Sequence, residues 1–341
     1  MEISKIKITS ENPNFKFKNV VKHMDCCFGI NDIFDIYYDK NNNFELYLIS
    51  PSENFSIAIT RLKDNQLIKS LQGHNQKITS LRCFYDEIKQ KDYLVSSSKK
   101  CKVIIWDLSN NFNLLYSLDV DYSQNSIIYS CLLFFTQNKG NYLITCSNET
   151  DSKDFSKIYN FENHQLICEL EGTNRIEIYY LLSWKNDDKD YLFETSIGRV
   201  IVHDLETKNL FHILNSPNRS IQNSACLIKN TQTNKIDLLA VPTIHGDIYF
   251  WDLNTFKLKF SIKYQNSYFY DIINWYDKYI IVAEKFNSLI VIIDISIRKI
   301  ITIMKNKNES FVISLKKINH PLYGESLLSS DIDNNISLYT H

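Results

Sequence analysis

The feature of this sequence that most restricts its fold is an internal repeat that runs through almost the whole chain. A short alternating run of apolar residues, often followed by an acidic residue, recurs seven times. Its marker residues are Thr60, Trp106, Tyr159, His203, Trp251, Ile293 and Tyr339. Successive markers lie 42 to 53 residues apart, which fits a repeated four-stranded β unit with loop insertions. The repeat predicts one all-β domain, although a length of 341 residues alone would allow two domains.

Each repeat unit is expected to contain four strands. An apolar entry strand comes first, a strand ending in small residues comes second, and the marker strand is third. A short polar turn then leads to a fourth strand, and this turn keeps one length in RLKDNQLIKSL (61–71), NFENHQLICEL (160–170) and DLETKNLFHIL (204–214). A polar insertion at 148–155 accounts for the longest spacing. Seven such units predict a seven-bladed β-propeller of four-stranded antiparallel blades.

The second unit carries the fullest set of recognisable residues. They are Gly73, His74, Ser96, Trp106 and Asp107. In this order they resemble the WD-repeat family, in which a His, Ser, Trp and Asp hydrogen-bond network often stabilises each blade. The resemblance implies that His74, Ser96 and Trp106 form such a network, and that Lys100 stands where the family has the Asp of the turn between the second and third strands. His74 and Trp106 are therefore interpreted as structural.

The other units keep only parts of this signature. The matching residues are His203, Asp204, Trp251, Asp252, Asp294 and Asp333. Asp333 holds the turn position of the last unit, where His245 and Asn287 stand in the fifth and sixth units. Because most of the networks are incomplete, we expect the blades to be stabilised mainly by packing and by sheet hydrogen bonds.

The two ends of the chain are expected to meet. The seventh unit, 311–341, has only three strands, and an uncovered outer strand would expose unpaired backbone groups. Residues 15–21 alternate like a strand and come shortly before the first unit. The family resemblance implies that the N-terminal segment, 1–24, supplies the outer strand of the last blade and that residues 25–341 form the propeller. A free N-terminal arm is the alternative.

Composition limits the partners and the compartment. The chain has 38 Lys and Arg residues against 39 Asp and Glu residues, so no overall field attracts nucleic acid or an anionic membrane. No stretch approaches the roughly twenty apolar residues of a membrane span, and the N-terminus has no apolar signal segment. The eight cysteines form no CxxC pair, and they are interpreted as free thiols of a reducing compartment, the cytoplasm or the nucleus.

Motifs of catalysis are absent from the sequence. It contains no Gly-rich phosphate loop, no GxSxG and no HExxH. His203-Asp204 resembles an acid/base pair, but it falls at the marker position of the repeat and is interpreted as part of the blade. The acidic run at 187–190 lacks the cation-loop pattern and is interpreted as a solvated loop. We therefore expect no enzymatic activity, no cofactor and no metal.

A partner-binding face is predicted at one rim. The family resemblance implies that the starts of the entry strands and the turns between second and third strands share the usual binding face. The candidate residues are Phe34, Lys99, Tyr129, Tyr179, Tyr268, Tyr270 and Phe286. Tyr and Phe bury much area at little entropic cost, which suits an interface. Their general abundance, 13% aromatic residues, is the competing explanation. Alanine at Tyr129, Tyr179 and Tyr270 together is expected to leave the thermal melt nearly unchanged.

The sequence thus favours a non-catalytic scaffold, or a subunit of a larger complex, that binds a protein or peptide on this rim. A propeller that binds phosphoinositides or a membrane surface is one alternative. It depends on lysines of the N-terminal segment, Lys5, Lys7, Lys16, Lys18 and Lys22. Their alternation fits the solvent face of an edge strand better, and no Phe-Arg-Arg-Gly motif like that of phosphoinositide-binding propellers occurs. A propeller enzyme with a site in the central channel is the other alternative, and the mostly uncharged inner strands argue against it.

Overall fold

The computed structural model describes most of the chain. The described residues are 16–22 (backbone only), 33–40, 42–123, 126–136, 140–147, 156–172, 176–186, 189–220, 223–264, 267–306, 308–333 and 335–340. The predicted insertion at 148–155, the predicted boundary at 24/25, and Lys5 and Lys7 lie outside these ranges. The described residues form seven four-stranded antiparallel sheets, which we number as blades 1 to 7 in chain order.

The first three blades follow one another without interruption of the pattern. Blade 1 contains β2 (Asp35–Asp39), β3 (Glu45–Pro51), a short 3-10 helix (Glu53–Phe55), β4 (Ile57–Arg61) and β5 (Gln66–Leu71). Blade 2 contains β6 (Ile78–Asp86), β7 (Lys91–Ser98), β8 (Lys102–Asp107) and β9 (Asn113–Asp119). Blade 3 contains β10 (Ile128–Phe134), β11 (Tyr142–Ser147), β12 (Lys157–Asn160) and β13 (Leu166–Glu169).

The remaining blades repeat this order. Blade 4 contains β14 (Ile178–Lys185), β15 (Asp190–Ser196), β16 (Arg199–Asp204) and β17 (Asn209–Asn215). Blade 5 contains β18 (Cys226–Lys229), β19 (Ile236–Pro242), β20 (Asp247–Asp252) and β21 (Lys257–Lys263). Blade 6 contains β22 (Phe269–Trp275), β23 (Tyr279–Glu284), β24 (Leu289–Asp294) and β25 (Lys299–Lys305). Blade 7 contains β26 (Val312–His320), β27 (Gly324–Asp331), β28 (Asn335–Thr340) and β1 (Lys16–Lys22).

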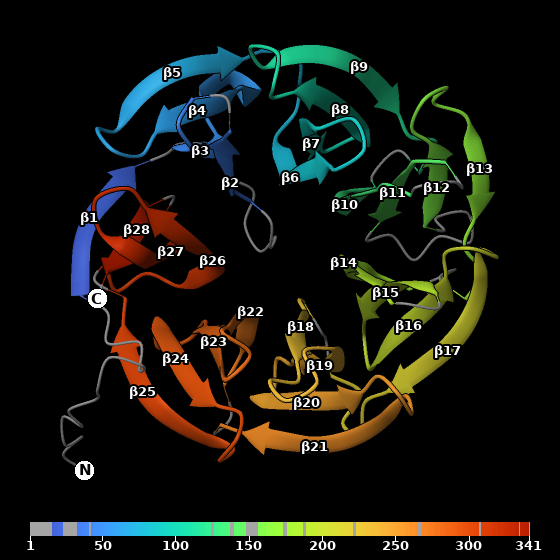
Figure 1. Cartoon of the computed structure of the whole chain (residues 1–341), viewed down its shortest axis with the longest axis vertical. Coiled ribbons are helices and arrows are strands. Elements are labelled where there is room, and N and C mark those ends of the chain that lie inside the picture. The colour runs from blue at the N-terminus through green and yellow to red at the C-terminus, as the bar shows by residue number, and fades with distance from the viewer. Residues whose placement is uncertain are drawn as a thin grey trace.

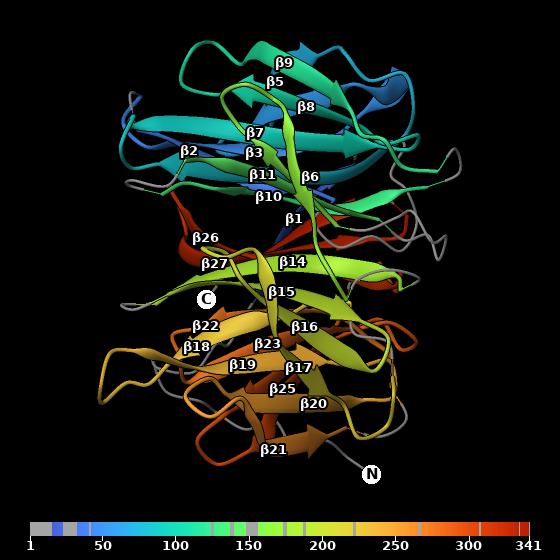
Figure 2. The same cartoon turned by 90° about the vertical axis from the view of Figure 1, so that its right-hand side faces the viewer.

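The blades form a ring, with the entry strand of each blade nearest the axis and the fourth strand at the circumference (Figure 1). Seen edge-on, the ring carries its connecting segments on two faces (Figure 2). β1 pairs antiparallel with β28, from Lys16 opposite Thr340 to Lys22 opposite Asn335. The predicted seven-bladed propeller, with its N-terminal strand completing the last blade, is confirmed. The pairing covers an edge that would otherwise expose backbone donors and acceptors.

The core lies between neighbouring blades. Ile57 and Ile59 of blade 1 pack with Leu94 and Ile104 of blade 2, and all four side chains are fully buried. A corresponding cluster joins blades 6, 7 and 1, so the closing seam is packed like the others. Each such side chain contributes about 1.5 to 3 kcal/mol by burial, which makes the sum over seven seams the main stabilising term.

In blades 4, 5 and 6 the aspartate after the marker closes the turn into the fourth strand. Asp204 Oδ1 accepts the backbone N–H groups of Glu206 at 2.9 Å and Thr207 at 3.0 Å. Asp252 and Asp294 accept the equivalent pairs of N–H groups in blades 5 and 6. A carboxylate bound to backbone two and three residues ahead fixes a tight turn. This explains why the turn has the same length in several units.

The signature residues of blade 2, His74, Ser96 and Trp106, form a buried network. His74 Nε2 lies 2.7 Å from Ser96 Oγ, and Trp106 Nε1 donates to the same oxygen at 2.9 Å. His74 Nδ1 lies 3.0 Å from Ser98 Oγ. Ser98, the last residue of β7, thus binds the histidine nitrogen that the expected turn Asp, replaced here by Lys100, would have bound. Both ring nitrogens of His74 therefore have hydrogen-bond partners, although Lys100 replaces the expected Asp.

Blades 4 and 5 fill these positions differently. His203 Nε2 lies 2.8 Å from Glu194 Oε2, and both side chains are fully buried. Glu194 holds the register position that Ser96 has in blade 2. In blade 5 that position is Val241, so the indole N–H of Trp251 has no hydrogen-bond partner among the described residues.

Blade 7 has a network of its own, and it corrects the assignment of Asp333. The buried acceptor is Asp331, which receives the backbone N–H groups of Asp333 at 3.1 Å and Asn335 at 3.0 Å. Asn306 donates to Asp331 at 3.3 Å and accepts the hydroxyl of Tyr339 at 2.9 Å. Asp333 is exposed in the turn and takes part through its backbone, because Asp331 ends β27 at the register position of Ser98.

Candidate binding face

One face of the ring, here called the entry face, holds the starts of the entry strands and the turns between second and third strands. In five blades the pairing of the entry strand skips its second residue, which is a β-bulge. The skipped residues are Thr79, Tyr129, Tyr179, Tyr270 and Ile313. A bulged residue leaves the ladder, and its side chain is released from strict alternation between the two sheet surfaces. Blades 3, 4 and 6 use this position for tyrosine.

Tyr129 and Tyr179 form the first aromatic pair of this face. Their rings are stacked, with centroids 5.6 Å apart and planes 16° apart. Both side chains are half-buried. The hydroxyl of Tyr179 donates to the carboxylate of Glu177. The two rings therefore present a fixed apolar surface, and the Glu177 carboxylate at its border already accepts a hydrogen bond.

Tyr268 and Tyr270 form the second pair, on blade 6. Their centroids are 5.1 Å apart, and Phe286 packs edge-on against Tyr268 at 5.8 Å. The ammonium nitrogen of Lys285 lies 4.8 Å from the centre of the Tyr268 ring and 5.1 Å from that of Tyr270. Phe286 is 58% exposed, which is high for a large apolar side chain held in a turn.

The hydroxyl groups of the two pairs lie close enough to affect one another. Burial raises the pKa of Tyr179, and the charges of Glu177 and of ionised Tyr129 and Tyr268 raise it further. Burial also raises the pKa of Tyr270, followed by the effects of Tyr268 and Tyr129. Tyrosines from blades 3, 4 and 6 thus converge on the ring axis. We call Tyr129, Tyr179, Tyr268, Tyr270 and Phe286 the aromatic cluster.

Phe34 does not lie on the entry face, and the prediction that placed it there is wrong. Its side chain is fully buried. It directly precedes Asp35, which has the register position of Arg82 in blade 2. Phe34 therefore matches the core residue Leu81 and not the rim residue Thr79. The pairing of β2 with β3 sets Asp35 opposite Ile49, so an alignment of Asp35 with Ser80 of blade 2 is two residues out of register.

Tyr270 belongs to the face and to the core at the same time. It is only 8% exposed and packs in the apolar cluster that joins blades 6, 7 and 1. The expectation that its removal leaves the thermal melt unchanged does not fit this burial. Tyr129 and Tyr179 are half-buried, and they remain suitable for alanine substitution.

Lys99 lies on the entry face beside the first aromatic pair. It forms an isolated antiparallel bridge with Ile127, two residues before Tyr129. Its backbone N–H donates to the carbonyl of Lys77 at 2.9 Å. The structure therefore brings Lys99 next to the aromatic cluster from the side of blade 2.

A shallow groove extends from the aromatic cluster between blades 5 and 6. It encloses about 550 Å³. Its lining residues are Asn218, Ile244, His245, Asp247, Lys263, Tyr268 and Phe286. Asn218 donates to Asp247 at 2.8 Å, so that carboxylate is already engaged. The groove adds a mixed polar and apolar surface to the entry face.

Charged side chains near the ring axis tie blades together, and sequence reasoning did not identify them. Arg82 Nη1 donates to the carbonyl of Leu181, two blades away, at 2.8 Å. Asp271 accepts the hydroxyl of Ser224 at 2.7 Å and the backbone N–H of Leu315 at 2.8 Å. The only sequence signal was a charged residue inside a run without other charges, SLRCFY around Arg82 and FYDIIN around Asp271. Within the described ranges no group of three or more His, Cys, Asp or Glu side chains is placed to hold a metal ion.

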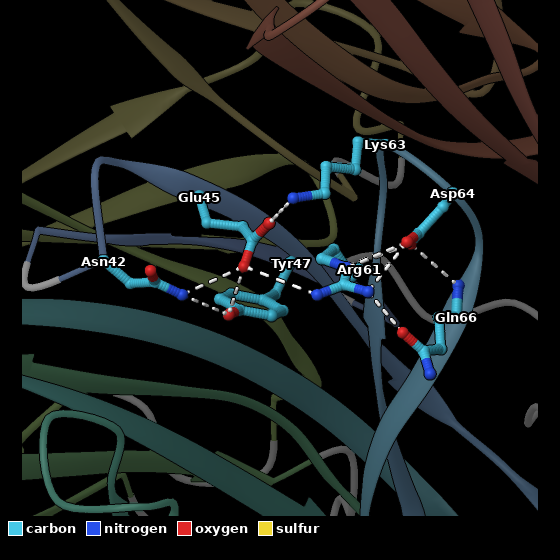
Figure 3. Close-up of polar contacts among 7 residues, drawn as sticks. All are labelled: Asn42, Glu45, Tyr47, Arg61, Lys63, Asp64 and Gln66. Atoms are coloured by element: carbon cyan, nitrogen blue, oxygen red, sulfur yellow. Dashed lines mark hydrogen bonds and ion pairs between the residues drawn. The ribbon is translucent and has the colours of Figure 1, made fainter.

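The opposite face carries a polar cluster on blade 1 (Figure 3). Glu45 pairs with Lys63 at 2.5 Å and accepts the hydroxyl of Tyr47 at 3.0 Å. The hydrogen bond from Lys63 is the largest cause of the lowered pKa of Glu45. Asn42 donates to Glu45 at 3.0 Å, and Arg61 lies 3.8 Å from it. These contacts satisfy one another within a single blade, so they form a local surface network and contribute little net stability.

The six cysteines among the described residues are free thiols, and they are Cys83, Cys101, Cys131, Cys146, Cys168 and Cys226. No helix in the described part of the chain is long and apolar enough to cross a membrane.

Comparison with known proteins identifies the fold. No family model matches the chain, and no curated protein matches it. Among solved structures, the beta-propeller domain of Cps50 (Swd1) from Myceliophteria thermophila is similar, with a TM-score of 0.72. The two chains are 14% identical, and the match covers 96% of this chain and 99% of that chain. At this identity the likeness concerns the fold alone.

Proposed function

We propose that this protein is a non-catalytic scaffold, or a subunit of a larger complex, that binds a protein or peptide segment on its entry face. The observation that carries the proposal is that two packed aromatic groups lie on the entry face, one formed by blades 3 and 4 and one by blade 6. Aromatic side chains held rigidly by stacking bury large area on binding and lose little further conformational freedom. Phe286, at 58% exposed, has the most surface to gain from a partner.

The surroundings of the aromatic cluster support binding over catalysis. Charged groups of the entry strands, Arg82, Asp271 and Asp35, are already engaged in bonds between blades. Glu177 and Asp247 at the entry face accept hydrogen bonds from neighbouring side chains. A catalytic acid or base needs a proton-transfer path to substrate, and these groups are committed to structural partners.

The proposal is tested by affinity capture from the source cell lysate, read by mass spectrometry. The test variant is Tyr129→Ala/Tyr179→Ala/Phe286→Ala, which avoids the buried Tyr270. The control variant is Phe44→Ala/Ile88→Ala/Leu322→Ala, three apolar side chains of the opposite face that are 64%, 56% and 66% exposed. We expect stoichiometric partners with wild type and control but not with the test variant. Partners retained by the test variant and lost by the control would place binding on the opposite face and refute the proposal.

A further inference from the structure

Four lysines gather at one corner of the entry face, beside the aromatic cluster. Lys77 precedes β6, Lys99 and Lys100 form the turn between β7 and β8, and Lys102 begins β8. Lys100 and Cys101 have φ values of 61° and 59°, so the turn is tight and keeps its lysines close together. The hydrogen bond from Lys99 N–H to the Lys77 carbonyl joins the two segments. We call Lys77, Lys99, Lys100 and Lys102 the lysine corner.

The positive charge of the lysine corner is not compensated within the described structure. None of its four ammonium groups forms an ion pair with a described residue. Lys102 donates to the Gly73 carbonyl at 3.2 Å, and Asp119 lies across from it in the sheet without forming an ion pair. Several exposed lysines elsewhere do have carboxylate partners; Lys63 pairs with Glu45 at 2.5 Å, and Lys89 pairs with Glu162 at 2.6 Å. Like charges held within a screening length repel one another, so this corner favours an anion.

The lysine corner and the aromatic cluster form one continuous surface. The bridge between Lys99 and Ile127 places the edge of the corner two residues from Tyr129. Tyr129 in turn stacks on Tyr179. An extended chain that crosses from blade 2 to blade 4 therefore passes from ammonium groups to aromatic rings over adjacent strands.

The charges of the aromatic cluster itself point away from a basic partner. Lys285 already lies over the rings of Tyr268 and Tyr270, which is where an incoming cation would gain most. The Glu177 carboxylate, which is the group that a cation of the partner would pair with, already accepts a hydrogen bond from the hydroxyl of Tyr179. This face is therefore best complemented by a partner that carries negative charge next to an apolar side chain.

We propose that the lysine corner and the aromatic cluster together bind an extended acidic segment of a partner protein. Asp or Glu side chains of the segment lie over the lysine corner, and a neighbouring apolar side chain lies against Tyr129 and Tyr179. Charge complementarity of this kind speeds association and selects the partner, while the aromatic contact provides most of the affinity. This inference rests on the proposed function, because it names the chemistry of the partner at the same face.

The test begins with selection of short random peptides, displayed on phage, against the full-length protein. Selected peptides should be rich in Asp and Glu with an adjacent apolar residue. Synthetic versions should bind about tenfold or more weakly to Lys77→Gln/Lys99→Gln/Lys100→Gln, and more weakly in high salt. The matched control is Lys63→Gln/Lys91→Gln/Lys189→Gln, whose lysines pair with carboxylates, and it should bind like wild type. The thermal melt of each variant verifies that it is folded.

The outcomes separate this inference from the proposed function. Peptides that lack acidic enrichment, or that bind the lysine-corner variant as tightly as wild type, would refute the acidic partner and leave the binding face in place. If the lysine-corner variant instead loses binding to vesicles of anionic lipid, or to an oligonucleotide, and no peptide depends on it, the partner is not a protein segment. Both proposals would be overturned if the selected peptides bind the lysine-corner variant and the Tyr129→Ala/Tyr179→Ala/Phe286→Ala variant as tightly as they bind wild type.

Discussion

Acid should destabilise this protein through His74, and the size of the effect follows from its surroundings. His74 is 7% exposed, and burial, together with the nearby Lys102 charge, lowers its pKa from 6.5 to about 4. Because the folded pKa is the lower one, the unfolded chain binds more protons between these values. The stability that neutral His74 provides is complete above pH 6.5 and is lost as the pH falls toward 4. At 1.4 kcal/mol per tenfold change in proton affinity, the full loss is about 3 kcal/mol.

The assay is urea unfolding of wild type and His74→Gln at pH 7.5 and pH 4.5, followed by circular dichroism. Other groups also titrate over this range, so the informative quantity is the difference between the two proteins in their acid-induced loss of unfolding free energy. We expect wild type to lose about 2 to 3 kcal/mol more than His74→Gln. The acid-induced loss for Lys102→Gln should lie between those of the two proteins, because this change removes the smaller of the two causes that lower the pKa of His74. Equal losses in wild type and His74→Gln would refute the assignment of a buried, neutral histidine.

Two further predictions concern the core. Tyr270→Ala should lower the free energy of unfolding by about 3 to 5 kcal/mol and Tyr129→Ala by clearly less, as measured by chemical denaturation; equal effects would mean that their burial is the same in solution. Val241→Thr gives the unpartnered Trp251 N–H an acceptor and should leave stability unchanged or raised. Val282→Thr, at the same position of blade 6 where Ile293 replaces the Trp, should cost about 1 to 3 kcal/mol; the reverse ranking would contradict the register that aligns the two blades.

The number of blades and the closure of the ring could be predicted because both depend on local sequence patterns that repeat along the chain. The marker strands alternate, and an Asp or Asn after the marker sets the length of the following turn, as Asp204 and Asp252 illustrate. Such a turn depends on residues two and three positions apart, which a single sequence displays directly. The closing strand was predictable for a similar reason, since the last unit ends one strand short.

The errors arose where a residue's role depends on distant strands. Phe34 was misplaced because the register of the entry strand is set by its pairing with β3, and no local residue type marks that register. Arg82 was overlooked because its partner, the carbonyl of Leu181, is 99 residues away. Asp333 was assigned from its turn position in the repeat, and the buried acceptor Asp331 became apparent only from the β27–β28 pairing. The lysine corner likewise could not be recognised without knowing that Lys77 and Lys99 are neighbours.

The bulges of the entry strands have a consequence for how this protein can change. A residue in regular pairing serves the core and the sheet at once, so its replacement disturbs both. The bulged residues of β10 and β14 lie outside the ladder, and their half-buried side chains border the ring axis. Substitution at Tyr129 or Tyr179 is therefore expected to change the surface of the entry face while leaving the strand register intact. The ring offers a set of interchangeable positions around one opening, and new specificities can arise there without a new fold.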